Sequence, residues 1–325
     1  MHRLTPDAAS VARFRADFES IAGRAPGADH RLGIAVSGGA DSLALLLLAA
    51  AAWPEAMAAA TVDHRMRPEA HDEAAFVHAL CAELQVPHDI LASPEPPGAD
   101  GNLQERAREM RYGLLGQWAV PQGIAWIATA HQRDDVAEGF LMRARRGSGV
   151  GGLAAMPALR PIGGGPALVR PLLDWTRAEL AEIVAAAGIE PVADPSNSNP
   201  RFDRSRIRAL LADTAELPAD RLAMAAANLR HAEDALDWLA AREWAVRVDI
   251  RDDAVSLDPA DLPYEIRRRL AQRAVTHFFP DWRGTGIDGL VAALDSGAPG
   301  TIAEVQARPV GGKWRFTPAP ARRSH

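Results

Sequence analysis

The sequence predicts an α/β protein in which a doubly wound, mostly parallel sheet is followed by a smaller, mainly helical domain. Two observations support this. Short apolar runs alternate with helical segments over residues 1–210, as in successive β-α-β units, and a glycine-rich turn joins the first run to the first helix. We expect strands at Leu32–Val36, Ala58–Val62, His88–Leu91 and Ala125–Ala130, with an edge strand or connector at Ala167–Leu172. We expect the intervening helices at Ser42–Ala52, Pro68–Leu84, Leu103–Trp118 and Asp134–Arg145.

The alternating pattern ends at a loop rich in proline, asparagine and serine, residues 194–200. Beyond this loop, Leu222–Val246 has a 3.6-residue apolar period, which is typical of an amphipathic helix. Further helices are expected at Pro263–Phe278 and Ile287–Leu294, and short extended segments at Thr301–Val305 and Trp314–Thr317. We therefore predict two domains, residues 1–210 and 211–325.

Composition excludes several classes of protein. The single cysteine, Cys81, cannot form an internal disulfide or a Cys-based zinc or iron–sulfur site, and we expect it to be a small buried residue of a helix. Lys313 is the only lysine among 36 basic residues, which excludes a Walker-type phosphate loop and a Schiff-base lysine in the body of the chain. The net charge of −6 argues against a protein that coats nucleic acid indiscriminately.

No segment has the features of a signal peptide or a membrane span. The N-terminal residues mix charges and lack an apolar core, and the longest apolar run, Leu43–Trp53, is too short to cross a bilayer. We expect a cytoplasmic protein without a membrane partner. The sequence leaves the oligomeric state open, a homodimer included.

The sharpest motif is Ser37-Gly38-Gly39-Ala40-Asp41-Ser42, between an apolar strand and an apolar helix. Its two glycines allow the backbone to approach a ligand closely, and the N–H groups at the helix start favour an anion such as phosphate. The two serines can add hydroxyl donors. Asp41 either caps the helix or holds a divalent cation against phosphates. A simple turn with an N-cap and no ligand is the alternative.

Polar residues also follow two other expected strands. Asp63 and His64 end the second strand, and His131 follows the fourth. In a doubly wound sheet, such residues lie beside the phosphate loop at the carboxyl ends of the strands. We therefore expect them to contact a nucleotide, although a lone histidine is more often a satisfied surface or core residue.

Charged residues form two further groups. Asp134, Asp135 and Glu138 begin a helix, where they bind a metal, recognise and deprotonate an amine, or only complement the helix dipole. An arginine cluster follows the loop at residues 194–200. Because guanidinium groups match phosphate geometry, we expect this cluster to contact RNA or a triphosphate. It consists of Arg201, Arg204, Arg206 and Arg208.

Together with the SGGADS loop, several blocks closely resemble the tRNA(Ile)-lysidine synthases, a branch of the N-type ATP pyrophosphatases, over residues 30–210. The blocks are Val62–Arg67, Gln104–Tyr112, Thr129–Glu138, Arg146–Leu153, Arg170–Leu180, Asp194–Asn197 and Phe202–Arg208. Gln132 and Gly139 depart from the family's pattern, in which a second histidine and a threonine are usual. Residues 210–325 resemble the family only in being helical with a short β tail.

The resemblance implies an adenine nucleotide alpha hydrolase-like fold and a reaction that uses ATP and Mg²⁺. In it, free lysine replaces the C2 oxygen of the wobble cytidine in the isoleucine tRNA with a CAU anticodon. An adenylated cytidine is the intermediate, and AMP and pyrophosphate are released. The resemblance also assigns catalysis to residues 1–210 and tRNA binding to residues 211–325.

The resemblance implies a role for each candidate residue. Asp41 would hold Mg²⁺, and Asp135 or Glu138 would deprotonate or orient the lysine amine. Arg111, with Arg206 or Arg208, would stabilise the developing phosphate charge. The residues expected to bind ATP are Ser37, Gly38, Gly39, Ala40, Asp41, Ser42, Asp63, His64 and His131.

Three other functions are consistent with the phosphate loop alone. A tRNA cytidine thiolase would need cysteine pairs, which a chain with one cysteine lacks. A small-molecule amidotransferase-type synthetase would leave the Asp194–Arg208 segment unexplained. A nucleotide-binding stress sensor would bind ATP without releasing pyrophosphate, and would give Asp41, the acidic group and the arginines no shared purpose.

Overall fold

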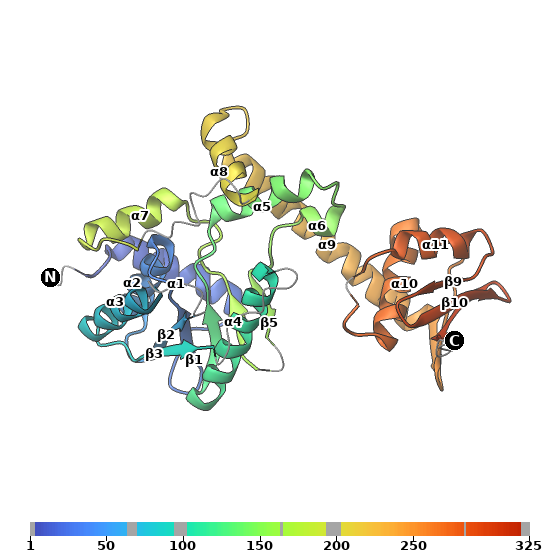
Figure 1. The fold of residues 1–325 in the computed structure, drawn as a ribbon, viewed down its shortest axis with the longest axis horizontal. Helices are drawn as coiled ribbons and strands as arrows, with labels where there is room; N and C mark the ends of the chain where they lie inside the picture. Colours follow the sequence, from blue (N-terminus) through green and yellow to red (C-terminus); the bar gives the residue numbers. More distant parts are fainter. Residues whose placement is uncertain are drawn as a thin grey trace. The chain divides into compact units, whose positions relative to one another are not determined.

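The computed structural model describes residues 4–63, 70–93, 103–162, 165–192, 203–282 and 284–319. The chain forms two compact units, Met1–Arg230 and His231–His325 (Figure 1). None of the described helices is both long enough and apolar enough to cross a membrane.

A six-stranded sheet with the order β3-β2-β1-β4-β6-β5 forms the centre of the first unit. Its parallel strands are β1 (Arg31–Ala35), β2 (Met57–Asp63), β3 (His88–Ala92), β4 (Ile124–Ala128) and β6 (Ala167–Val169). The chain adds β2 and β3 on one side of β1 and then β4 on the other. The topological switch point, where ligands bind in such sheets, therefore lies between β1 and β4.

The expected parallel sheet is confirmed, with one difference at its edge. β6 is an interior strand, because it pairs with β4 on one side and with the antiparallel strand β5 (Leu159–Pro161) on the other. We did not expect β5 from the sequence. It is only three residues long and includes Pro161, which has no N–H to donate and is therefore tolerated at a sheet edge.

Helices cover both faces of this sheet. α1 (Ala8–Ala22), α2 (Ala40–Ala52), α3 (Ala70–Glu83) and α7 (Arg177–Ala186) share one large core with the sheet, and α4 (Leu103–Ala119) packs on the opposite face. The apolar run Leu43–Leu48 makes α2 the central helix of its layer, fully or almost fully buried. Cys81 is buried in α3, as expected.

Beyond the sheet, α5 (Arg133–Ala144) leaves the end of β4 and contacts α8 (Asp203–Asp213). The short helix α6 (Val150–Leu153) follows α5. Val136 of α5 packs with Ala223 and Ala226 of the long helix α9 (Ala219–Arg247). The first turns of α9 thus belong to the first unit, whereas Leu236, Leu239 and Ala240 pack in the core of the second.

The second unit combines helices with an antiparallel sheet of the order β7-β8-β11-β10-β9. The helices are α10 (Tyr264–Phe278) and α11 (Ile287–Asp295), and the strands are β7 (Val248–Arg251), β8 (Ala254–Leu257), β9 (Gly300–Ile302), β10 (Val305–Val310) and β11 (Lys313–Pro318). This sheet is larger than the short β tail we expected, because β7 and β8 add a hairpin around Asp252. The division between the units falls inside α9 rather than near residue 210, since this helix continues without a break from one core into the other.

Candidate active site at the carboxyl ends of β1 and β4

The SGGADS loop connects β1 to α2 at the switch point of the sheet. Gly38 has a φ of 83°, in the left-handed region, and a Cβ placed on it would lie 3.1 Å from Cγ2 of Val192. The Ser42 hydroxyl donates to the Gly39 carbonyl (2.9 Å) and accepts from the Ser37 amide (3.1 Å). Gly39 is the N-cap of α2 and supplies no side-chain acceptor. The first amides of α2 thus form a site suited to phosphate oxygens.

The residues that follow β4 face the same edge of the sheet. Nδ1 of His131 lies 2.9 Å from the Thr129 hydroxyl, with which it forms a hydrogen bond. Burial, followed by the charges of Arg170 and Arg108, lowers the pKa of His131 to about 3. The ring is therefore neutral at pH 7, when it can serve a nucleotide as a hydrogen-bonding or stacking partner but not as a cation.

Asp41, in the first turn of α2, lies near a second carboxylate. Burial, and then the charge of Asp135, raises the pKa of Asp41 to about 6. A carboxylate whose pKa is raised by a second carboxylate is stabilised in its charged form by a cation between or beside the two. Within the described ranges, no group of three or more Asp, Glu, His or Cys side chains could hold a metal ion. The two carboxylates of Asp41 and Asp135 nevertheless fit Mg²⁺, because this ion usually takes one or two carboxylates and completes its shell with phosphate oxygens and water.

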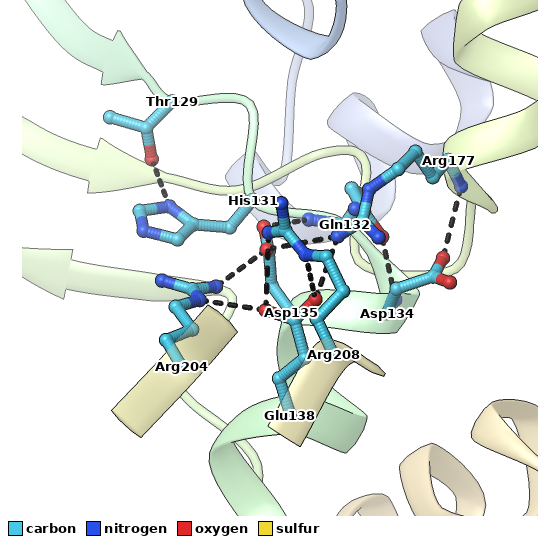
Figure 2. A network of polar contacts seen from close by, with 9 residues as sticks. All are labelled: Thr129, His131, Gln132, Asp134, Asp135, Glu138, Arg177, Arg204 and Arg208. Carbon is cyan, nitrogen blue, oxygen red and sulfur yellow. Dashed lines mark hydrogen bonds and ion pairs between the residues drawn. The ribbon is translucent and has the colours of Figure 1, made fainter. Parts of the chain in front are cut away.

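Glu138 is the centre of a cluster of ionic contacts (Figure 2). Its carboxylate is almost completely buried and accepts hydrogen bonds from three arginines. Nη2 of Arg177 in α7 donates at 2.9 Å, and from α8 Nε of Arg204 donates at 2.7 Å and Nε of Arg208 at 2.9 Å. Arg204 also contacts Asp135 at 2.5 Å. The cluster therefore joins α5, α7 and α8 at one point.

The arginines decide the protonation state of Glu138. Burial alone would raise the pKa of this carboxyl group, but hydrogen bonds from Arg208, Arg204 and Arg177 outweigh it and lower the pKa to about 2. Burial raises the pKa of Asp135, and Arg204 partly offsets that effect. A carboxylate with a pKa of about 2 is a poor proton acceptor at pH 7. Glu138 is thus suited to holding arginines in place rather than to acting as a base.

The structure brings only some of the predicted residues together. Asp41, His131, Asp135, Glu138 and Arg208 lie at or near the switch point, and the charge of Arg111, in α4, contributes to the low pKa of His131. Asp134 lies on the other side of the helix start, where it accepts a hydrogen bond from the Arg177 amide (3.0 Å). Asp63 is the last residue of β2. His64, Arg201 and the Asp194–Asn197 block lie outside the described residues.

Arg206 is not part of the Glu138 cluster. Its guanidinium contacts Asp203, and half of its side-chain surface is exposed. The reason is helical geometry: Arg204 and Arg208 are four residues apart on one face of α8, whereas Arg206 is rotated by about 200° from Arg204. Of these two arginines, Arg208 is the one that lies in the Glu138 cluster.

Sequence reasoning did not assign catalytic roles to Arg177 and Arg204, which the cluster contains. The spacing of Arg204 and Arg208 was a usable signal, since residues four apart share a helix face. Gln132 was also undervalued. Gln132 is completely buried, and its side-chain oxygen accepts a hydrogen bond from the backbone amide of Asp134. The Asp135 carboxylate in turn accepts one from the backbone amide of Gln132, and these two bonds form a capping box for α5.

Comparisons with known proteins agree with this geometry. A family model described as a PP-loop domain matches residues 11–215. A tRNA(Ile)-lysidine synthase from Zymomonas mobilis is 43% identical over 300 residues, 90% of each chain, and one from Novosphingobium aromaticivorans is 39% identical, covering 97% of this chain and 95% of its own. A U34-tRNA thiolase from Methanococcus maripaludis, solved with its [4Fe-4S] cluster, has a similar fold, with a TM-score of 0.55, 15% identity and coverage of 69% of this chain and 80% of its own.

Proposed function

The chain belongs to the tRNA(Ile)-lysidine synthases of the PP-loop family, and from this premise we propose that it joins lysine to the wobble cytidine of a CAU-anticodon isoleucine tRNA. The observation that carries the proposal is the position of the SGGADS loop beside the Glu138 cluster, at the switch point of the sheet. A triphosphate site and a site rich in arginine and carboxylate groups then face the same reacting centre.

In the first step, the C2 oxygen of the cytidine attacks the α-phosphorus of ATP, and pyrophosphate leaves. The amides of the loop and of the α2 N-terminus bind the departing phosphates. Asp41, beside Asp135, would hold Mg²⁺, which neutralises phosphate charge when bound. Arg208 and Arg111 stabilise the charge that develops on the transferred group.

In the second step, the lysine ε-nitrogen attacks C2, the bond from C2 to oxygen breaks, and AMP leaves with that oxygen. The ammonium form, with a reference pKa of about 10.4, must first lose a proton. Because three arginines hold Glu138 ionised, we assign Glu138 to organising the site, and Asp135, whose pKa is raised, to orienting the amine and accepting its proton. Contact of the second unit with the tRNA body and a cytoplasmic location belong to the same proposal.

The fold likeness to a thiolase does not extend to sulfur chemistry. The sequence contains one cysteine, and burial raises the pKa of this residue, Cys81, to about 12. A thiol with this pKa is not a nucleophile at pH 7, and a single cysteine cannot supply the several thiolates that hold an iron–sulfur cluster.

The decisive experiment combines protein, Mg²⁺, ATP, labelled lysine and an isoleucine tRNA transcript with a CAU anticodon. Acid-precipitable label should appear only when ATP is present, and a methionine tRNA transcript is the control. Release of pyrophosphate without incorporated label would retain the adenylating chemistry but reject lysine as the nucleophile. Absence of both signals would reject the proposed function.

A further inference from the structure

A second group of arginines lies on the opposite face of α8 from the Glu138 cluster. Arg145 and Arg146, at the end of α5, each place Nη2 3.0 Å from Oδ2 of Asp203, and Arg206 contacts the other oxygen of the same carboxylate. We call Arg145, Arg146 and Arg206 the outer arginine patch. The patch joins the end of α5 to the start of α8. Unlike the carboxylates of the inner cluster, its side chains are exposed to solvent.

The charges of this patch are unbalanced. Three guanidinium groups share one carboxylate, and their side chains remain 50%, 59% and 51% exposed. In the inner cluster, by contrast, two carboxylates offset three arginines, and these carboxylates, Glu138 and Asp135, are only 1% and 12% exposed. Surface pairs of this kind add little stability. Among the described residues, the patch has an excess of about two positive charges. In a chain with a net charge of −6, such a local excess marks a place for an anionic partner.

We propose that the outer arginine patch binds backbone phosphates of the tRNA whose wobble cytidine occupies the active site. This inference rests on the proposed function. ATP bound at the phosphate loop does not account for the patch, because the inner face of α8 is the one near the loop, where the charge of Arg208 acts on Asp41, and Arg206 lies on the other face. RNA extends beyond the reacting base and presents phosphates at regular intervals, and forked guanidinium groups match these phosphates.

The patch also explains Arg206, which sequence reasoning placed in catalysis. Arg206 acts as a positioning residue, because it contacts the RNA backbone rather than the reacting atoms. Since α8 carries both arginine faces, RNA bound on the outer face is coupled through one short helix to the residues that hold Glu138.

The test measures binding of a labelled isoleucine tRNA transcript by fluorescence anisotropy, at several KCl concentrations. The variant is Arg145→Gln/Arg146→Gln/Arg206→Gln. The control, Arg15→Gln/Arg24→Gln/Arg221→Gln, removes the same charge at exposed sites elsewhere in the first unit. For the patch variant we expect Kd to rise at least about tenfold and the slope of log K against log salt to fall by about 2. The KM for tRNA should rise, while the KM for ATP stays within about twofold.

Equal effects of the two triple variants would overturn the inference, since the patch would then act only through net charge. Wild-type protein that neither binds the transcript nor incorporates lysine would instead reject the proposed function. If the triple variant unfolds at a lower temperature than the wild type, Arg206→Gln alone provides the test. Its expected slope change is about 0.7, and an unchanged slope would again overturn the inference.

Discussion

At the scale of single residues, Glu138 is the side chain on which the geometry of the site depends most. Its folded pKa of about 2 lies below the ordinary value of 4.5. The stability that its ionised form contributes is therefore fully present above pH 4.5 and is lost as the pH falls toward 2. The shift corresponds to about 3 kcal/mol.

We expect Glu138→Gln to lower the free energy of unfolding by about 3–5 kcal/mol at pH 7, because three arginines then surround an uncharged amide. At pH 3 the difference between the variant and the wild type should be smaller. Urea unfolding at both pH values measures it, with the exposed Glu216→Gln as the control. A difference that stays the same at both pH values would contradict the proposed ionic origin.

Asp41 is the residue whose role depends most on a cation. If it holds Mg²⁺ against the phosphates of ATP, Asp41→Asn should lower the rate of lysidine formation at least about a hundredfold. It should also raise the Mg²⁺ concentration needed for half-maximal rate, which a magnesium titration measures. Asp29→Asn, at an exposed position, serves as the control. Activity of Asp41→Asn near the wild-type level would remove the metal role.

At the scale of elements, the two glycines of the phosphate loop have different tasks. Gly38 has the positive φ and contacts Val192, so Gly38→Ala should destabilise the chain by about 1–2 kcal/mol. Gly39 has an ordinary φ of −76°, and a Cβ there would meet only Oγ of Ser37, at 3.8 Å. Gly39→Ala should therefore preserve stability but raise the KM for ATP, because the methyl group occupies space beside the phosphates.

Thermal unfolding and ATP kinetics of the two variants separate these tasks. Each variant is the control of the other, since both add one methyl group to adjacent residues. An unchanged KM for ATP in a stable Gly39→Ala protein would show that the triphosphate does not approach this part of the loop.

The elements themselves also show what the sequence could reveal. The apolar run of α2 and the strands β1 to β4 are set by local hydrophobic pattern, which a reader of the sequence sees directly. The hydrophobic pattern did not predict a helix in the polar segment that forms α8. Only the helical rotation of α8 separates Arg204 and Arg208, on one face, from Arg206 on the other. The alternation of Val248, Ile250, Val255 and Leu257 was a signal for the β7–β8 hairpin. Contacts between distant segments, such as Arg177 with Glu138, left no local signal.

At the scale of the whole molecule, each unit has its own core. The residues that we expect to bind ATP all lie in the first unit, whereas the second contains an ionic network of its own, in which Arg269 and Glu233 are largely buried. In that network, Arg269 of α10 contacts Glu233 at 2.6 Å, Asp237 at 2.5 Å and Glu265 at 2.8 Å. Arg269 thus ties α10 to the part of α9 that belongs to the second unit.

This separation predicts that damage to the second unit spares ATP binding. Arg269→Met leaves the nearly buried Glu233 without its cation and should destabilise the second unit by about 3–5 kcal/mol. The KM for tRNA should rise, because we assign contact with the tRNA body to this unit, while the KM for ATP should not change. Urea unfolding followed by tryptophan fluorescence, together with both KM values, tests this.

The control is Arg251→Met, which breaks an exposed pair with Asp249 and should change stability by less than about 1 kcal/mol. If the KM for ATP rose together with that for tRNA, the two units would act as one in catalysis, and the assignment of tRNA binding to a separable second unit would fail.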